Sequence, residues 1–157
     1  MMNDLLRGAL GKALGRRPPA LQVAALCVSA ETGKVLLITS RGTKRWIIPK
    51  GWPMTGRSAA GAALQEAWEE AGVRGKVDEV AFGEYSYLKR LPGGISQPVI
   101  AQVHMVRVTS LVRDYPEHRQ RQRKWFSAAK AAELVDEDGL KALIGRLEGE
   151  AKPGKKG

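Results

Sequence analysis

The chain has 157 residues, enough for one domain with its own core, and its 43% hydrophobic and 27% charged residues are typical of globular proteins. A formal net charge of +10 favours anionic partners such as phosphorylated small molecules, nucleic acid or an acidic membrane surface. The single cysteine, Cys27, excludes an internal disulfide, and no apolar run approaches the roughly 20 residues of a membrane-spanning helix, so we expect a cytoplasmic protein.

Residues 1–20 form a basic segment with leucine and alanine side chains at helical spacing. Arg7 and Lys12 interrupt its apolar run, which argues against an export signal. We favour a short surface helix packed on the domain over a membrane anchor. The domain itself is expected to cover residues 21–148, and residues 149–157 are expected to form a disordered basic tail.

Two apolar segments after this region predict a β-hairpin. Residues 21–30 are apolar on both faces, which is typical of a buried strand, and Cys27 is expected to be a core residue of that strand. Residues 31–34, Glu-Thr-Gly-Lys, predict a turn, and residues 35–39 predict the second strand.

Two further segments predict sheet strands. Residues 77–88 carry Tyr85 and Tyr87 on one face, and residues 99–111 form a long valine-rich run. His104 lies in this run without a partner motif, so we interpret it as a hydrogen-bonded sheet residue and not as a catalyst.

Between these strands, residues 51–73 predict a loop–helix–loop segment. Ser58 is a suitable N-cap for a helix that begins at Ala59, and Gly72 is a suitable residue to end it. Turns are predicted on the N-terminal side by the prolines and glycines of residues 49–56.

Three carboxylates, Glu66, Glu69 and Glu70, lie within about 100° of one another on this helix. They repel one another unless a cation lies among them, and Mg²⁺ prefers oxygen ligands of this kind. The alternative is an ordinary solvated acidic face. The opposite face is apolar and contains Ala60, Ala63, Leu64, Ala67, Trp68 and Ala71.

This segment resembles the signature of the Nudix hydrolase family, G-x5-E-x7-R-E-U-x-E-E-x-G-U, in which U is an aliphatic residue. The matching positions are Gly51, Glu66, Ala67 (loosely), Glu69, Glu70, Gly72 and Val73. Two positions depart from the signature: Arg57 replaces its first glutamate, and Gln65 replaces its arginine. The glutamates that bind metal in the family are present.

The resemblance implies a Nudix-type α/β/α sandwich with a mixed β-sheet and a metal-dependent hydrolase that cleaves a phosphoanhydride. It further implies that Glu66, Glu69 and Glu70 hold Mg²⁺, with Mn²⁺ as the alternative, and that the carbonyl of Gly51 assists. The general base would be one of these carboxylates or a loop glutamate such as Glu117.

Residues 114–126 are rich in arginine. If this stretch is extended, Arg119, Arg121 and Arg123 share one face and could bind several phosphates; the alternative is a solvated edge strand. Residues 128–135, after Ser127, and residues 139–147 predict C-terminal helices.

The basic residues favour a phosphate-rich substrate. We expect substrate binding by Arg41, Lys44, Lys50 and Arg57 together with the arginines of residues 119–123. The runs W-I-I-P-K-G and W-F resemble the diphosphoinositol polyphosphate and diadenosine polyphosphate hydrolases within the family. The alternatives are a protein that processes RNA ends or binds nucleic acid, which is less favoured, and a catalytically silent ligand sensor.

Overall fold

The computed structural model describes residues 18–150, except for the side chains of residues 148–150. The surface helix expected before residue 18 and the disorder expected beyond residue 150 therefore lie outside the described residues. No helix in the described part of the chain is long and apolar enough to cross a membrane.

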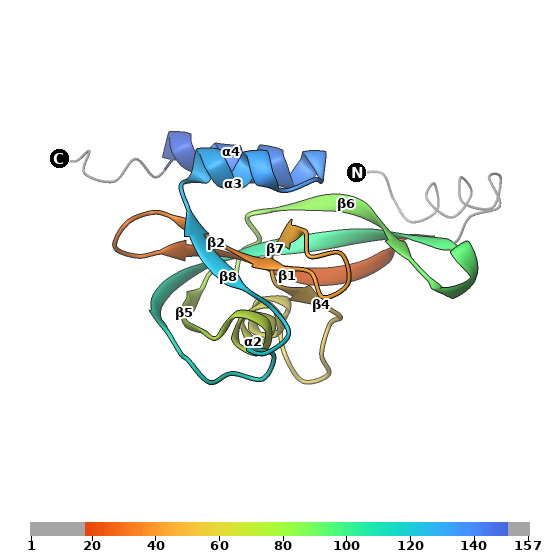
Figure 1. Cartoon of the computed structure of the whole chain (residues 1–157), viewed down its shortest axis with the longest axis horizontal. Coiled ribbons are helices and arrows are strands. Elements are labelled where there is room, and N and C mark those ends of the chain that lie inside the picture. Colours follow the sequence, from red (N-terminus) through yellow and green to blue (C-terminus); the bar gives the residue numbers. More distant parts are fainter. Residues whose placement is uncertain (1–17, 151–157) are drawn as a thin grey trace.

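A mixed sheet of eight strands forms the centre of the described region (Figure 1). Its main path is β3-β2-β1-β7-β5, while β4 pairs with β1, β6 with β7 and β8 with β2. The long strands β1 and β7 are parallel, and the other pairs are antiparallel. The strands are β1 (Ala20–Ser29), β2 (Val35–Thr39), β3 (Trp46–Ile47), β4 (Lys50–Gly51), β5 (Val73–Val77), β6 (Gly83–Arg90), β7 (Ser96–Leu111) and β8 (Arg123–Phe126).

Helices cover both faces of this sheet (Figure 1). Helix α2 (Ala59–Ala71) lies on one face, and α3 (Ala128–Leu134) with α4 (Asp138–Glu150) lies on the other. Side chains alternate along β1, so Ala24 and Leu26 pack in the core under α3 and α4, while Ala25 and Cys27 pack in the core under α2. This arrangement confirms the α/β/α sandwich and explains why β1 is apolar on both faces.

Most of the predicted elements are present, with shifted bounds. The hairpin of β1 and β2 is confirmed by the antiparallel pairing of Val28 with Val35. The strand predicted within residues 77–88 is β6, which begins at Gly83, while β5 ends at Val77. Helix α4 reaches Glu150, two residues into the expected tail.

Cys27 and His104 have the structural roles that the sequence predicts. Cys27 is fully buried, and this burial raises the pKa of its thiol to about 12. The imidazole of His104 donates from Nδ1 to the carbonyl of Asp78 at 2.8 Å, so its Nε2 accepts from the Gln102 amide, also at 2.8 Å. Both ring nitrogens are therefore occupied within the sheet.

Candidate active site

Helix α2 is fixed at both ends by the caps that its sequence predicts. Ser58 accepts a hydrogen bond from the backbone N–H of Gly61 at 3.0 Å, and Gly72 ends the helix with a left-handed φ of 67°. Its face toward the sheet is lined by small side chains, which allow the helix to approach the strands closely. These are the fully buried alanines Ala62, Ala63, Ala67 and Ala71.

This close approach buries two of the three predicted carboxylates. Glu66 is 9% exposed and Glu70 is 7% exposed, so they do not form the solvated acidic face that was the alternative interpretation. Burial and the neighbouring Glu70 carboxylate raise the pKa of Glu66 to about 8. Burial also raises the pKa of Glu70, although the Arg121 guanidinium opposes this shift. Two buried carboxylates held together in this way form a site suited to a cation.

Strand β4 completes this site opposite α2. Gly51 packs directly on the Glu66 carboxylate, so that a Cβ atom at residue 51 would clash with it. The backbone N–H of Lys50 donates to Glu70 Oε1 at 3.3 Å. Pairing of Gly51 with Val23 on β1 holds β4 in this position. A larger residue at position 51 would therefore displace the Glu66 carboxylate from this position.

The donor set fits a hard divalent cation such as Mg²⁺. Glu66 and Glu70 offer carboxylate oxygens, and the backbone of Gly51 lies against them. The third carboxylate, Glu69, has a partner of its own, since its Oε2 accepts from the Gln65 amide at 2.8 Å. Within residues 18–150 no three acidic, histidine or cysteine side chains form a ready-made ligand group, so water or substrate oxygens would supply the other ligands, as Mg²⁺ usually requires.

Arg121 joins the loop after β7 to this carboxylate site. Its side chain is only 7% exposed, and its Nε donates to Glu117 Oε1 at 2.7 Å. The same guanidinium lies 3.6 Å from Glu70 Oε2 and donates to the carbonyl of Thr39 at 3.1 Å. The backbone N–H of Glu117 donates to the carbonyl of Glu69 at 3.0 Å, which attaches the loop to α2. Glu117 therefore lies beside the predicted metal ligands.

The predicted row of three arginines on one extended face does not form. Residues 116–120 adopt turns, and β8 begins only at Arg123. Tyr115 is buried at 6% exposure and anchors the chain, and the turns begin at Pro116, whose fixed φ suits the first central position of a turn. Arg123 binds the carbonyls of Ala71 and Val112, each at 2.8 Å, which is a structural role.

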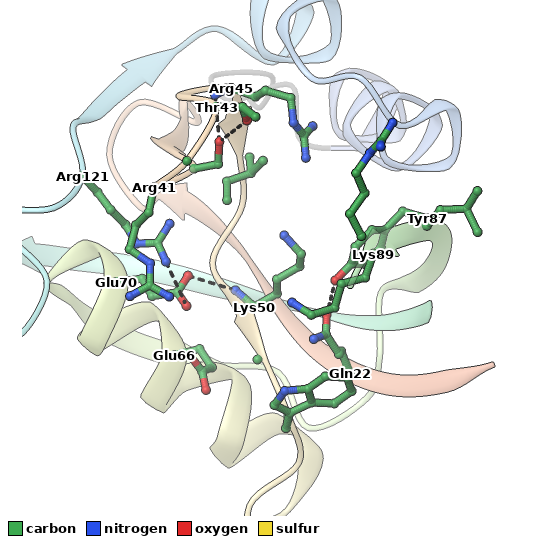
Figure 2. A pocket seen from close by; sticks show the side chains of 17 residues that line it. Gln22, Arg41, Thr43, Arg45, Lys50, Glu66, Glu70, Tyr87, Lys89 and Arg121 are labelled. Carbon is green, nitrogen blue, oxygen red and sulfur yellow. Dashed lines mark hydrogen bonds and ion pairs between the residues drawn. The ribbon is translucent and has the colours of Figure 1, made fainter. Parts of the chain in front are cut away.

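A cavity of about 760 Å³ opens over the carboxylates and contains six cationic side chains. Figure 2 shows Arg41 and Arg121 beside Glu70, with Gln22, Tyr87 and Lys89 on the opposite wall and Lys50 between them. Burial lowers the pKa of Lys50, and this effect is opposed by the charges of Glu70 and Glu137. The six cations are Arg41, Arg45, Lys50, Lys89, Arg90 and Arg121.

Only part of the predicted substrate-binding set lies in this cavity. Arg41, Lys50 and Arg121 line it, and Arg41 is oriented by a hydrogen bond to Gln120 at 3.1 Å.

The other predicted cations lie elsewhere. Arg57 lines a separate cavity of about 350 Å³ beside the start of α2. Lys44 is exposed on the β2–β3 loop, and Arg119 is exposed in the turn before β8. Arg123 is committed to backbone carbonyls, as described above.

Sequence reasoning missed the contributions of Arg45 and of strand β6. Arg45 lines the cavity and forms ion pairs with Asp136 and Glu137, each at 3.2 Å. Lys89 and Arg90 also line it from the end of β6. One signal was present: Lys89 continues the alternation of Tyr85 and Tyr87 and so belongs to the same face of the strand.

Comparison with known proteins agrees with this geometry. The NUDIX domain family model matches residues 18–144. Human diphosphoinositol polyphosphate phosphohydrolase 3-alpha is 33% identical over 122 residues, covering 73% of this chain and 68% of that protein. Nudix hydrolase 21, chloroplastic, from Arabidopsis thaliana is 34% identical over 120 residues, covering 72% of this chain and 58% of that protein. The match covers 51% and 56% of two further plant relatives, so the chain spans about half their length.

Solved structures show the same fold at lower sequence identity. A Nudix hydrolase from Nitrosomonas europaea has a TM-score of 0.63 and 22% identity, covering 83% of this chain and 89% of that one. The C. elegans Ap4A hydrolase has a TM-score of 0.57 and 16% identity, covering 83% of this chain and 97% of that one. The family model matches most of the chain, and two of the signature carboxylates, Glu66 and Glu70, line one cavity, so the chain belongs to the Nudix hydrolase family.

Proposed function

We propose that this chain is a metal-dependent pyrophosphohydrolase that cleaves a phosphoanhydride bond in a phosphate-rich substrate, such as a diphosphoinositol polyphosphate or a dinucleoside polyphosphate. The observation that carries the proposal is the convergence of two buried carboxylates and six cationic side chains on one cavity. The names of the human and C. elegans relatives support the same two substrate classes.

Glu66 and Glu70 would hold the divalent ion against the backbone of Gly51, with Glu69 from the same signature close by. When bound, such an ion neutralises phosphate charge and acidifies water. Mg²⁺ is the expected ion, with Mn²⁺ as the alternative. Arg121 fixes Glu70 and Glu117 in place, and Glu117 stays a candidate for the general base because it lies beside these carboxylates.

The cations would bind phosphates on both sides of the bond that is cut. Arg41 and Arg121 lie on the Glu70 side of the cavity, and Lys89 lies on the opposite wall (Figure 2). A substrate with one or two phosphates could contact only some of these groups at once. The spread of positive charge therefore favours a substrate with several phosphates over a nucleoside diphosphate sugar.

The proposed activity is tested with Mg²⁺ or Mn²⁺ on three substrate classes: diphosphoinositol polyphosphates, from which loss of the terminal phosphate is measured as inorganic phosphate, and dinucleoside polyphosphates and nucleoside diphosphate sugars, for which the two phosphorylated products are separated and measured by chromatography. Glu66→Gln and Glu70→Gln should each lower kcat by orders of magnitude, because each removes a metal ligand. Glu133→Gln is the control, because its carboxylate is 72% exposed on α3. No hydrolysis of any substrate would favour a ligand sensor, and full activity of both site variants would refute the metal-site assignment.

Arg41 and Lys44 provide a matched pair for testing the cavity. Both are exposed cations on the β2–β3 loop, but only Arg41 lines the cavity. A charge-assisted hydrogen bond contributes about 1.5–3 kcal/mol, so Arg41→Gln should raise KM for a phosphate-rich substrate by about tenfold or more. Lys44→Gln should leave KM unchanged. Equal effects of the two changes would show that only overall charge matters.

A further inference from the structure

A buried carboxylate outside the proposed metal site lies behind the wall of the cavity. Glu137 immediately precedes α4, and its side chain is 10% exposed. Its Oε2 accepts from Arg45 Nη1 at 3.2 Å, whereas its Oε1 is fully buried and has no hydrogen-bond partner among the described residues. In that part of the chain, every other buried side-chain nitrogen or oxygen has a partner.

The stability of the fold does not explain a carboxylate at this position. Burying a charge with one oxygen unpaired lowers stability relative to a neutral side chain of similar size. The carboxylate does not cap α4, because Oε2 pairs with Arg45 and Oε1 has no donor among the described residues. The exposed Asp138 in the first turn already supplies the negative charge that favours a helix N-terminus.

The charge of Glu137 reaches the cavity through three residues that line it, namely Arg45, Lys50 and Tyr87. Burial lowers the pKa of Lys50, and the charges of Glu70 and Glu137 oppose this shift. Burial raises the pKa of Tyr87 to about 12, and the charge of Glu137 contributes to this rise. Figure 2 shows Arg45 on the side of the cavity away from Glu66, with Lys50 between them. Glu137 thus places a negative charge behind the Arg45 end of the cavity.

Arg41 and Arg45 line the same cavity but differ in what holds them. Arg41 Nη1 donates to the uncharged Gln120 amide at 3.1 Å, so its partner does not offset its positive charge. Arg45 Nη1 lies 3.2 Å from Asp136 Oδ2 and 3.2 Å from Glu137 Oε2. The Asp136 side chain is 67% exposed and is screened by water, so the buried Glu137 offsets the charge of Arg45 more strongly.

We propose that Glu137 is a positioning residue for the hydrolytic reaction, which holds Arg45 toward one phosphate of the substrate and offsets its charge, so that this phosphate is oriented without being bound tightly. The inference rests on the proposed hydrolase function. A phosphate remote from the bond that is cut is bound equally before and after the reaction, and such binding lowers KM without raising kcat. Glu137 therefore limits the retention of a phosphorylated product at the Arg45 end of the cavity.

The first test measures binding without metal or turnover. Isothermal titration calorimetry of inorganic tripolyphosphate in EDTA compares the wild type with Glu137→Gln and Asp136→Asn. Glu137→Gln should lower Kd by about three- to tenfold, because it removes a buried charge but keeps an acceptor for Arg45. Asp136→Asn is the matched control, with the same distance to the same nitrogen, and should change Kd by less than about twofold. An unchanged or higher Kd in Glu137→Gln that is folded by circular dichroism would overturn the proposal.

Two arginine variants test the same point if Glu137→Gln does not fold. Arg41→Gln should raise the Kd of tripolyphosphate by about tenfold or more, because its charge is not offset. Arg45→Gln should raise it by less than about threefold, because Glu137 already offsets that charge. Equal losses in the two variants would show that Glu137 does not offset Arg45 and would overturn the proposal.

Steady-state kinetics with Mg²⁺, on the dinucleoside or diphosphoinositol polyphosphate that is hydrolysed, relate the effect to the reaction. Glu137→Gln should lower KM and the inhibition constant of the phosphorylated product by the same factor, about three- to tenfold, without raising kcat. A lower kcat at unchanged KM would assign Glu137 a structural role and overturn the proposal. If no substrate is hydrolysed, the proposed function fails, and a lower Kd of tripolyphosphate in Glu137→Gln still supports the charge effect of Glu137.

Discussion

Replacing Arg121 with glutamine should destabilise the protein more than any exposed substitution near the site. The change leaves Glu70, which is 7% exposed, without its ion pair at 3.6 Å and leaves Glu117 without its bond at 2.7 Å. At an effective dielectric constant of about 20, the attraction at 3.6 Å alone is about 5 kcal/mol before desolvation is subtracted. Removing one partner of a buried ion pair is expected to lower the free energy of unfolding by about 3–5 kcal/mol.

That loss is a large part of the total stability, which is about 5–15 kcal/mol for a domain of this kind. For a chain of this length, it corresponds to a fall in Tm of about 10 °C. Urea unfolding followed by circular dichroism, in EDTA, would measure the loss. Arg119→Gln is the matched control, because its side chain is exposed two residues away and should change stability by less than about 0.5 kcal/mol.

The same measurement with MgCl₂ tests whether the carboxylates bind metal. A divalent ion between Glu66 and Glu70 would replace part of the charge that Arg121 supplies, so the loss should be smaller than in EDTA. In EDTA the loss of unfolding free energy in Arg121→Gln should also become smaller as the pH falls from 8 toward 5. Protonation of the crowded carboxylates removes their repulsion, and it begins near pH 8 because the pKa of Glu66 is raised from 4.5 to about 8. A loss below about 1 kcal/mol in EDTA, or an equal loss with and without Mg²⁺, would refute this reasoning.

Two further predictions concern the signature itself. Gly51→Ala should lower kcat strongly, because the added Cβ would displace the Glu66 carboxylate, while the secondary structure stays nearly unchanged. Steady-state rates measure the first effect and circular dichroism the second. A normal kcat would contradict the prediction. Restoring the usual residues by Gln65→Arg and Arg57→Glu should not raise kcat. Gln65 already donates to Glu69, and Arg57 lies in another cavity, so a large gain would show that the site has decayed.

The central helix and sheet were predictable because their signals are local. Ser58 and Gly72 set the ends of α2 through hydrogen bonds and a backbone conformation that their own chemistry determines. The apolar run of β1 predicted a strand covered on both sides, and α2 lies on one side with α3 and α4 on the other. These inferences need only the periodicity of side chains along one element.

The burial of Glu66 and Glu70 could not be predicted from the helix alone. Helical spacing placed both on a face opposite the apolar residues, and from the helix alone a solvated acidic face was the favoured expectation. The burial of Glu66 depends on β4, where Gly51 packs directly against the Glu66 carboxylate. That contact depends on the pairing of β4 with β1, which joins residues far apart in the chain.

The prediction that three arginines share one face was wrong for a similar reason. Alternation along residues 119–123 holds only if the chain is extended, and the buried ring of Tyr115 with the turns after it prevents this. Arg121 then turns toward Glu70, and Arg123 turns toward the carbonyls at the end of α2. Long-range packing, and not local periodicity, decided which of these guanidinium groups reached the cavity.

The cationic side chains of the cavity thus differ in whether another residue holds them in place. Arg41 and Arg45 are each held by a hydrogen bond or ion pair from another loop, and Arg121 is held by Glu117 of its own loop and by Glu70 on α2. In the described region Lys89 and Arg90 on β6 have no such bond. A side chain that is already fixed loses less conformational freedom when a phosphate binds. The fixed arginines are therefore suited to orient phosphates near the carboxylates, and the β6 pair is suited to follow phosphates whose number and spacing vary.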